Sequence, residues 1–140
     1  MYLIIVNSNK FQNVVAAIIK KDNLYLIAKR NRHKHLGLKW EFPGGKVNLK
    51  ETFEEALLRE IKEELSISIE IHHKIAEESF RDEKINVVLH YFICSHTLGS
   101  ITLNEHEDYA WVEKKIFINM ILQKETVIFY LYFRNILKID

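Results

Sequence analysis

Three glutamates near the middle of the chain, Glu60, Glu63 and Glu64, have a spacing that would gather their carboxylates on one side of a helix. Each helical residue advances by about 100°, so the three side chains fall within an arc of about 100°. Like charges held this close repel each other, by roughly a few tenths of a kcal/mol for an exposed i,i+4 pair. Arg59 precedes them directly, but one guanidinium cannot neutralise three carboxylates. Hard divalent cations can, so the pattern fits a site for Mg²⁺, or else for Mn²⁺, although on spacing alone such a helix face is more often simply solvated.

The residues that flank this cluster follow a recognisable spacing. From Gly45 the chain runs five residues to Glu51, then seven more to the segment 59–67, which reads Arg-Glu-Ile-Lys-Glu-Glu-Leu-Ser-Ile. This arrangement resembles the Nudix box, in which Gly, Glu, Arg-Glu, an apolar residue, Glu-Glu and a final Gly-apolar pair stand at the same spacings. Average residue usage would match the retained positions at a given start with a probability on the order of one in a hundred million.

One position departs from the box, because Ser66 stands where the family pattern has glycine. A glycine just past the end of a helix commonly adopts the left-handed conformation, which costs a non-glycine residue roughly 1–2 kcal/mol. The departure therefore concerns the local geometry at the helix end. The chemistry is less affected, since the ligands implied by the resemblance are carboxylates upstream.

The resemblance implies a role for each box residue. It implies that Arg59 orients a glutamate and that Glu51 supports this orientation without binding the metal itself. The group that takes the proton of the attacking water varies within the family, with Glu60 as the first candidate and Glu63 as the second. The implied metal shell consists of the Gly44 carbonyl and the carboxylates of Glu60, Glu63 and Glu64.

Similarity beyond the box points to one branch of the family. The hairpin that begins at Asn13, the run from Trp40 to Lys46 and the strand around Trp111 look like the MutT and CTP pyrophosphohydrolase branch. In that branch a further metal-binding glutamate lies on a loop ahead of a tryptophan. Glu105 occupies such a place before Trp111, although an ordinary loop acid is the equal alternative.

Candidate substrate contacts lie near the glycine turn and in the basic loop that precedes it. Lys46 is a mobile point charge and Arg30 a planar fork, and both suit phosphate oxygens, although solvated surface cations are the alternative. Glu41 and Gly45 join them as candidates because they belong to the same run. Lys124 appears at the position where MutT-type enzymes carry a base-reading asparagine and CTP-directed relatives an aspartate. The base therefore stays open.

Turn signals and periodicity predict the elements that must position these residues. Thr52 and Glu55 form a capping-box signature, which opens a helix over 53–65. The tail over 125–137 is apolar and favours a second helix on length. Strands are expected over 13–19, 24–28, 66–71, 85–94 and near 110–112, with turns at 22–23 and 82–83. The expected fold is a Nudix-type α/β/α sandwich, in which a mixed β-sheet is flanked by the box helix and a C-terminal helix.

Length and composition restrict the class of protein. The 140 residues, 48% hydrophobic and 28% charged, suit one globular domain over 1–140. A formal net charge of +1 gives no general attraction for nucleic acid or an anionic membrane. Cys94 is the single cysteine, which fits a reducing cytoplasm, and the apolar run 2–6 is too short for a secretory signal or a membrane span.

With these restrictions, the resemblance implies a Mg²⁺-dependent nucleoside triphosphate pyrophosphohydrolase, which would convert a ribo- or deoxynucleoside triphosphate, including an oxidised or cytidine nucleotide, to the monophosphate and pyrophosphate. Its partner would be a small-molecule nucleotide, with no stable binding to nucleic acid or membrane, and it would work as a monomer or homodimer. Trp40, Phe80 and Tyr91 are candidates to stack on the base, although aromatic residues on strands are more often core. The alternatives are a Nudix hydrolase of another nucleoside diphosphate-linked compound and a catalytically silent nucleotide-binding Nudix module.

Overall fold

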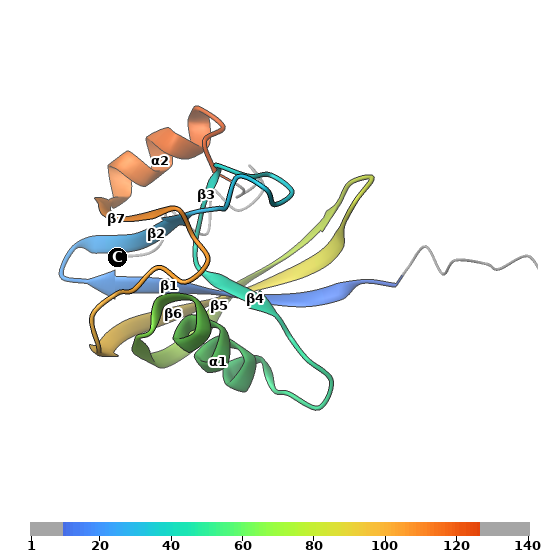
Figure 1. The fold of residues 1–140 in the computed structure, drawn as a ribbon, viewed down its shortest axis with the longest axis horizontal. Helices are drawn as coiled ribbons and strands as arrows, with labels where there is room; N and C mark the ends of the chain where they lie inside the picture. The colour runs from blue at the N-terminus through green and yellow to red at the C-terminus, as the bar shows by residue number, and fades with distance from the viewer. Residues whose placement is uncertain (1–9, 127–140) are drawn as a thin grey trace, which may run out of the picture.

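The computed structural model describes residues 10–126, which form a mixed β-sheet covered by one helix on each face (Figure 1). The expected α/β/α sandwich is therefore confirmed. The two helices are α1 (Phe53–Leu65) and α2 (Lys114–Leu122). The strands are β1 (Gln12–Lys21), β2 (Leu24–Lys29), β3 (Trp40–Glu41), β4 (Gly44–Lys46), β5 (Ser68–Arg81), β6 (Asn86–Leu98) and β7 (Asp108–Glu113).

Strand β1 is the centre of the sheet. It pairs in parallel with β6 along its length, while on its other edge it pairs antiparallel with β4 near its start and with β2 near its end. The main order is β3-β2-β1-β6-β5, with β7 on β2. The segment from Val15 to Ile19 is fully buried, since helices cover both faces of the sheet there. This explains its continuous run of β-branched residues and alanines.

The hairpin and the two later strand regions agree with the sequence expectations. The β1–β2 turn lies at the expected place, and Asp22 adopts a left-handed φ of 54° there. At the β5–β6 turn, the Asp82 carboxylate accepts hydrogen bonds from the backbone N–H groups of Lys84 and Ile85. Strand β5 begins at Ser68, later than the expected start at 66, because Ser66 still caps helix α1. It continues to Arg81, well beyond the expected end at 71, while β6 continues to Leu98, beyond the expected end at 94, because the two strands pair over this whole length.

Helix α1 has the predicted bounds. The Thr52 hydroxyl accepts a hydrogen bond from the Glu55 N–H and so caps the first turn. Apolar residues one helical turn apart, Leu57, Ile61 and Leu65, are fully buried against the β1 face of the sheet. This packing fixes the rotation of the helix and hence the direction of its acidic face.

The second face of the sheet is covered by α2, which was not expected at residues 114–122. The helix begins directly after β7, and Phe117 and Ile121 pack on Ile18 and Tyr25. The predicted tail helix over 125–137 falls almost wholly outside the described residues. Within residues 10–126, neither helix has the length and apolar character needed to cross a membrane.

Candidate active site

The two glycines of the turn bring β4 into direct contact with both β1 and α1. A Cβ on Gly44 would lie 1.8 Å from the Val15 carbonyl oxygen, and a Cβ on Gly45 would lie 2.3 Å from the carboxyl carbon of Glu60. Neither position could hold a side chain without moving backbone or the Glu60 carboxylate. The absence of side chains therefore places the acidic face of α1 beside the edge of the sheet.

Arg59 ties together the acids of the box. Its guanidinium donates two hydrogen bonds to Glu51, at 2.6 and 2.8 Å, and others to Glu60 at 2.9 Å and Glu63 at 3.2 Å. It also donates to the Lys46 carbonyl oxygen at 3.0 Å. Arg59 lowers the pKa of Glu51 to about 2, chiefly through these hydrogen bonds. The guanidinium thus binds carboxylate oxygens of these three glutamates, and its bond to the Lys46 carbonyl connects α1 to β4.

Glu64 is the glutamate of this cluster whose carboxylate is not bound by Arg59. Its side chain is buried, and its Oε2 atom has no hydrogen-bond partner. Burial, together with the nearby charges of Glu41, Glu60 and Glu105, raises its pKa to about 9. Burial also raises the pKa of Glu60, against the opposing effect of Arg59. An ionised carboxylate is costly in such a place unless a cation accompanies it, so this acid fits a metal ligand.

The loop before β7 brings Glu105 to the same place. Asn104 donates its backbone N–H to the Glu64 carbonyl at 3.0 Å and its side-chain amide to the Glu63 carbonyl at 2.7 Å. These bonds attach the loop to the last turn of α1. Glu105 follows directly, lines the cavity with Glu60 and Glu64, and forms an ion pair with Lys34 at 3.1 Å.

Ser66 adopts the conformation for which the box glycine is suited. Its φ of 57° and ψ of 29° are left-handed, and its backbone N–H bonds to the Lys62 carbonyl as a helix cap does. Its hydroxyl accepts a hydrogen bond from Asn104 at 3.0 Å. The serine therefore keeps the geometry of the box, and its hydroxyl adds a contact that a glycine would lack.

Glu41 lies between two partners on the opposite wall of the cavity. One of its oxygens accepts a hydrogen bond from Arg30 at 2.8 Å, and the other lies 2.8 Å from the Nε2 atom of His106. His106 carries no spacing signal in the sequence, because it is one histidine in an acidic loop. The pairing leaves the second terminal nitrogen of the Arg30 fork for other contacts, and Arg30 lines the cavity.

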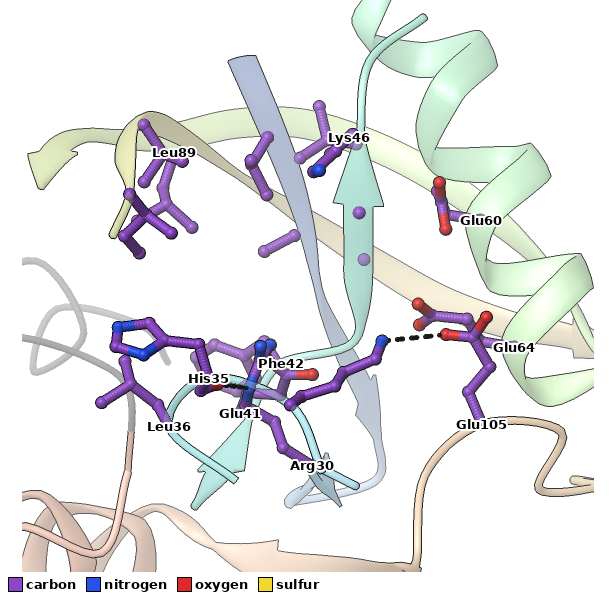
Figure 2. A pocket seen from close by; sticks show the side chains of 18 of the residues that line it. Arg30, His35, Leu36, Glu41, Phe42, Lys46, Glu60, Glu64, Leu89 and Glu105 are labelled. Atoms are coloured by element: carbon purple, nitrogen blue, oxygen red, sulfur yellow. Dashed lines mark hydrogen bonds and ion pairs between the residues drawn. The ribbon is translucent and has the colours of Figure 1, made fainter. Parts of the chain in front are cut away.

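These elements enclose a cavity of about 490 Å³ with two unlike ends. Figure 2 shows Glu60, Glu64 and Glu105 on one side of it and Leu36 and Leu89 on the other. Hairpin β5–β6 supplies much of the apolar end, and Phe80 reaches it from the part of β5 that extends beyond the expected strand. The apolar lining also includes Phe42, Phe80, Ile85, Val87 and Tyr91.

Most of the residues expected from the sequence meet in this cavity. Arg59 and Glu51 are not part of its lining, but Arg59 donates hydrogen bonds to Glu60 and Glu63, which are, and Glu51 accepts hydrogen bonds from Arg59. Lys124 is outside the lining: it is an exposed residue just after α2, and its carbonyl oxygen accepts a hydrogen bond from Lys39. Trp40 is also outside, whereas Phe80 and Tyr91 line the apolar end. The expected residues in the lining are Arg30, Glu41, Gly44, Gly45, Lys46, Glu60, Glu63, Glu64 and Glu105.

The carboxylates are near one another but are held by protein cations. Across residues 10–126, no three acidic, imidazole or thiol groups already converge as a closed metal shell. Arg59 and Lys34 pair with Glu60, Glu63 and Glu105 instead. The buried, unpartnered oxygen of Glu64 and the all-oxygen donor set nevertheless suit a hard divalent cation.

Comparison with known proteins agrees with this geometry. The sequence model of the NUDIX domain family matches residues 10–131. The CTP pyrophosphohydrolase of Escherichia coli K12 is 33% identical over 102 residues, which cover 73% of this chain and 76% of that protein. The nucleoside triphosphatase NudI of Klebsiella pneumoniae is 34% identical over 130 residues, covering 82% of this chain and 91% of its own.

Solved structures give the same result. The MutT protein of Methanosarcina mazei Go1 superposes with a TM-score of 0.80 at 25% identity, over 92% of this chain and 94% of that one. The chain belongs to the Nudix family. It is a hydrolase of phosphoanhydride bonds, and its relatives include nucleotide pyrophosphohydrolases.

Glu64 predicts how stability depends on pH. Its pKa is about 4.5 when unfolded and about 9 when folded, so its contribution is full below about pH 4.5 and is lost as pH rises toward 9. We therefore expect the metal-free protein to have a smaller free energy of unfolding at pH 9 than at pH 7. Urea unfolding at both values measures the difference. Glu64→Gln should flatten the slope, and an unchanged slope would contradict the assignment.

Proposed function

We propose that this protein is a Mg²⁺-dependent nucleoside triphosphate pyrophosphohydrolase, which converts a triphosphate to the monophosphate and pyrophosphate. The observation that supports this most is a cavity that has acids at one end and apolar side chains at the other. A nucleotide has the same polarity, with metal-binding phosphates at one end and a flat base at the other. Mn²⁺ would serve as an alternative to Mg²⁺.

The proposed roles of the residues at the acidic end are metal binding, orientation of the acids and proton transfer. The Gly44 carbonyl and the four acids Glu60, Glu63, Glu64 and Glu105 would hold the metal. The bound metal would neutralise the phosphoryl oxygens and make the attacking water more acidic. Arg59 orients Glu60 and Glu63 through its hydrogen bonds, and Glu51 orients Arg59 in turn. Proton transfer from the water falls to Glu60 first and to Glu63 second.

Phosphate contacts come from the rim of the acidic end. Lys46 is exposed and lines the cavity. Arg30 also lines the cavity, and one nitrogen of its guanidinium donates a hydrogen bond to Glu41. Gly45 allows close approach of a ligand to the backbone of β4, and Glu41 fixes Arg30. Each cation would stabilise charge on the departing pyrophosphate.

The base would lie between Phe80 and Tyr91 at the apolar end. Related proteins are named for CTP and for 8-oxo-dGTP, so both cytidine and oxidised guanine nucleotides belong in a substrate panel. Lys124 is not among the residues that line the cavity, so we assign the choice between these bases to the residues of the lining. Free nucleotides are the proposed partners in a cytoplasmic setting, since a net charge of +1 offers no general attraction for nucleic acid.

Product analysis over ribo-, deoxy- and oxidised nucleoside triphosphates with Mg²⁺ tests the proposal. We expect monophosphate and pyrophosphate in equal amounts, because the acidic end holds the metal-bridged phosphates while the apolar end holds the base. Oxygen-18 water then shows which phosphorus is attacked. Inorganic phosphate as the first product would contradict the proposal and point to a terminal-phosphate hydrolase.

A further inference from the structure

Lys34 is a cation at the acidic end that the sequence pattern did not indicate. It lies on the loop between β2 and β3, and its Nζ atom is 3.1 Å from the Glu105 Oε2 atom. Figure 2 draws this ion pair as the dashed line that ends on Glu105. Both side chains are about half exposed, at 48% and 50%, so the pair is accessible to solvent and to ligands.

The backbone around Lys34 is fixed on both sides. Two residues earlier, Arg32 bonds to Glu107 through its backbone N–H at 2.7 Å and through its guanidinium. One residue later, the His35 ring lies 2.6 Å from the Asp82 carboxylate on hairpin β5–β6. The loop is thus attached to the segment before β7 and to hairpin β5–β6. Lys34 can change partner by rotating its long side chain, without movement of the loop.

The charge of Lys34 acts on Glu64 as well as on Glu105. It opposes the burial and the neighbouring acids that raise the pKa of Glu64. A divalent cation held by Glu64 and Glu105 would need the same carboxylate and would repel the ammonium. An exposed ion pair of this kind shifts an equilibrium only about two- to fivefold, so such a cation can displace the lysine easily.

We infer that Lys34 is an exchangeable phosphate ligand, paired with Glu105 without metal and transferred to the substrate phosphates when metal takes its place. The inference rests on the proposed function. A lysine suits this role because its ammonium is a compact point charge with three donors on a flexible stem. Since Lys34 and Lys46 both line the cavity, the released ammonium is near the phosphates that the acids and metal would hold.

The substitution Lys34→Met tests the inference through two effects of opposite sign. Without the competing cation, nucleotide-free protein should bind Mn²⁺ about two- to fivefold more tightly, measured by titration calorimetry. A triphosphate analogue with methylene groups in place of both bridging oxygens, in the presence of Mg²⁺, should bind about tenfold more weakly. Lys34→Arg should recover most of the analogue affinity. A purely structural role for Lys34 would not move the two affinities in opposite directions.

Lys39→Met is the matched control. Lys39 lies at the end of the same loop, but its ammonium bonds to the Lys124 carbonyl at 2.6 Å and does not line the cavity. We expect both affinities to stay unchanged in this variant. In a Glu105→Gln background, Lys34→Met should raise the affinity for Mn²⁺ less than in the wild-type background, because only the weaker effect of Lys34 on Glu64 is left.

The outcomes separate the inference from the function on which it rests. If wild-type protein hydrolyses triphosphates and Lys34→Met leaves either affinity unchanged, the inference is wrong and the proposed function stands. If wild-type protein binds no Mn²⁺ and cleaves no triphosphate, both are wrong. Opposite shifts in Lys34→Met, absent from Lys39→Met, support the inference.

Discussion

Glu63→Gln should reduce kcat by at least about a hundredfold while leaving the fold nearly intact. The Glu63 side chain is 59% exposed and contacts Arg59 at 3.2 Å, so it fills no part of the core. The change from carboxylate to amide keeps the volume but removes a charge that would hold the metal. Steady-state kinetics over a range of Mg²⁺ concentrations, together with urea unfolding, measures both effects.

Glu54→Gln is the control for this experiment. Glu54 is an exposed acid in the first turn of the same helix and is not part of the cavity lining. Its variant should keep wild-type turnover. Without metal, the Glu63 variant should be as stable as wild type or slightly more so, because one of the repelling acids is gone. Full activity in Glu63→Gln would remove Glu63 from the metal shell.

Arg59→Met should lower both stability and turnover, because Arg59 forms ion pairs with several glutamates. Its loss would leave Glu51 and Glu60, whose side chains are only 15% exposed, without their cation. We expect a melting temperature lower by about 5–10 °C and a kcat lower by at least about tenfold. Differential scanning calorimetry and kinetics on the same preparation measure the two effects.

The pH dependence of this loss provides a separate check. Glu51 has its pKa lowered to about 2, so the stability it contributes through Arg59 is present above its unfolded pKa of about 4.5 and is lost as pH falls toward 2. The difference between wild type and Arg59→Met should therefore shrink below about pH 4.5. Arg32→Met is the matched control, because Arg32 pairs with Glu107 at the surface, and its melting temperature should change by only about 2 °C. Equal shifts in the two variants would contradict the role given to Arg59.

Local sequence was sufficient for the elements whose causes are local. The bounds of α1 follow from the Thr52 cap and from the spacing of its apolar residues, and both are visible within one helical segment. The grouping of Glu60, Glu63 and Glu64 follows from the same helical period. The β1–β2 hairpin was likewise predictable, because its turn residues and its buried strand adjoin each other in the chain.

Properties that depend on distant contacts could not be read in this way. Glu63 and Glu64 are neighbours of identical chemistry, yet one is exposed and the other buried, because packing against the sheet decides how α1 is rotated. The length of β5 depends on its partner β6, since its own alternation is weak beyond residue 71. Helix α2 was missed because its short apolar segment follows a strand without a clear capping signal.

The partners that lie far apart in the sequence were decided by tertiary structure. Lys34 meets Glu105 across 71 positions of sequence, and Asn104 meets Ser66 across 38. No periodicity connects residues so far apart, because helical and strand repeats describe only neighbours along the chain. The sequence by itself determined that carboxylates would gather on one helix face. Folding of the sheet determined which cations and which apolar wall stand opposite them, since only the folded chain brings these segments together.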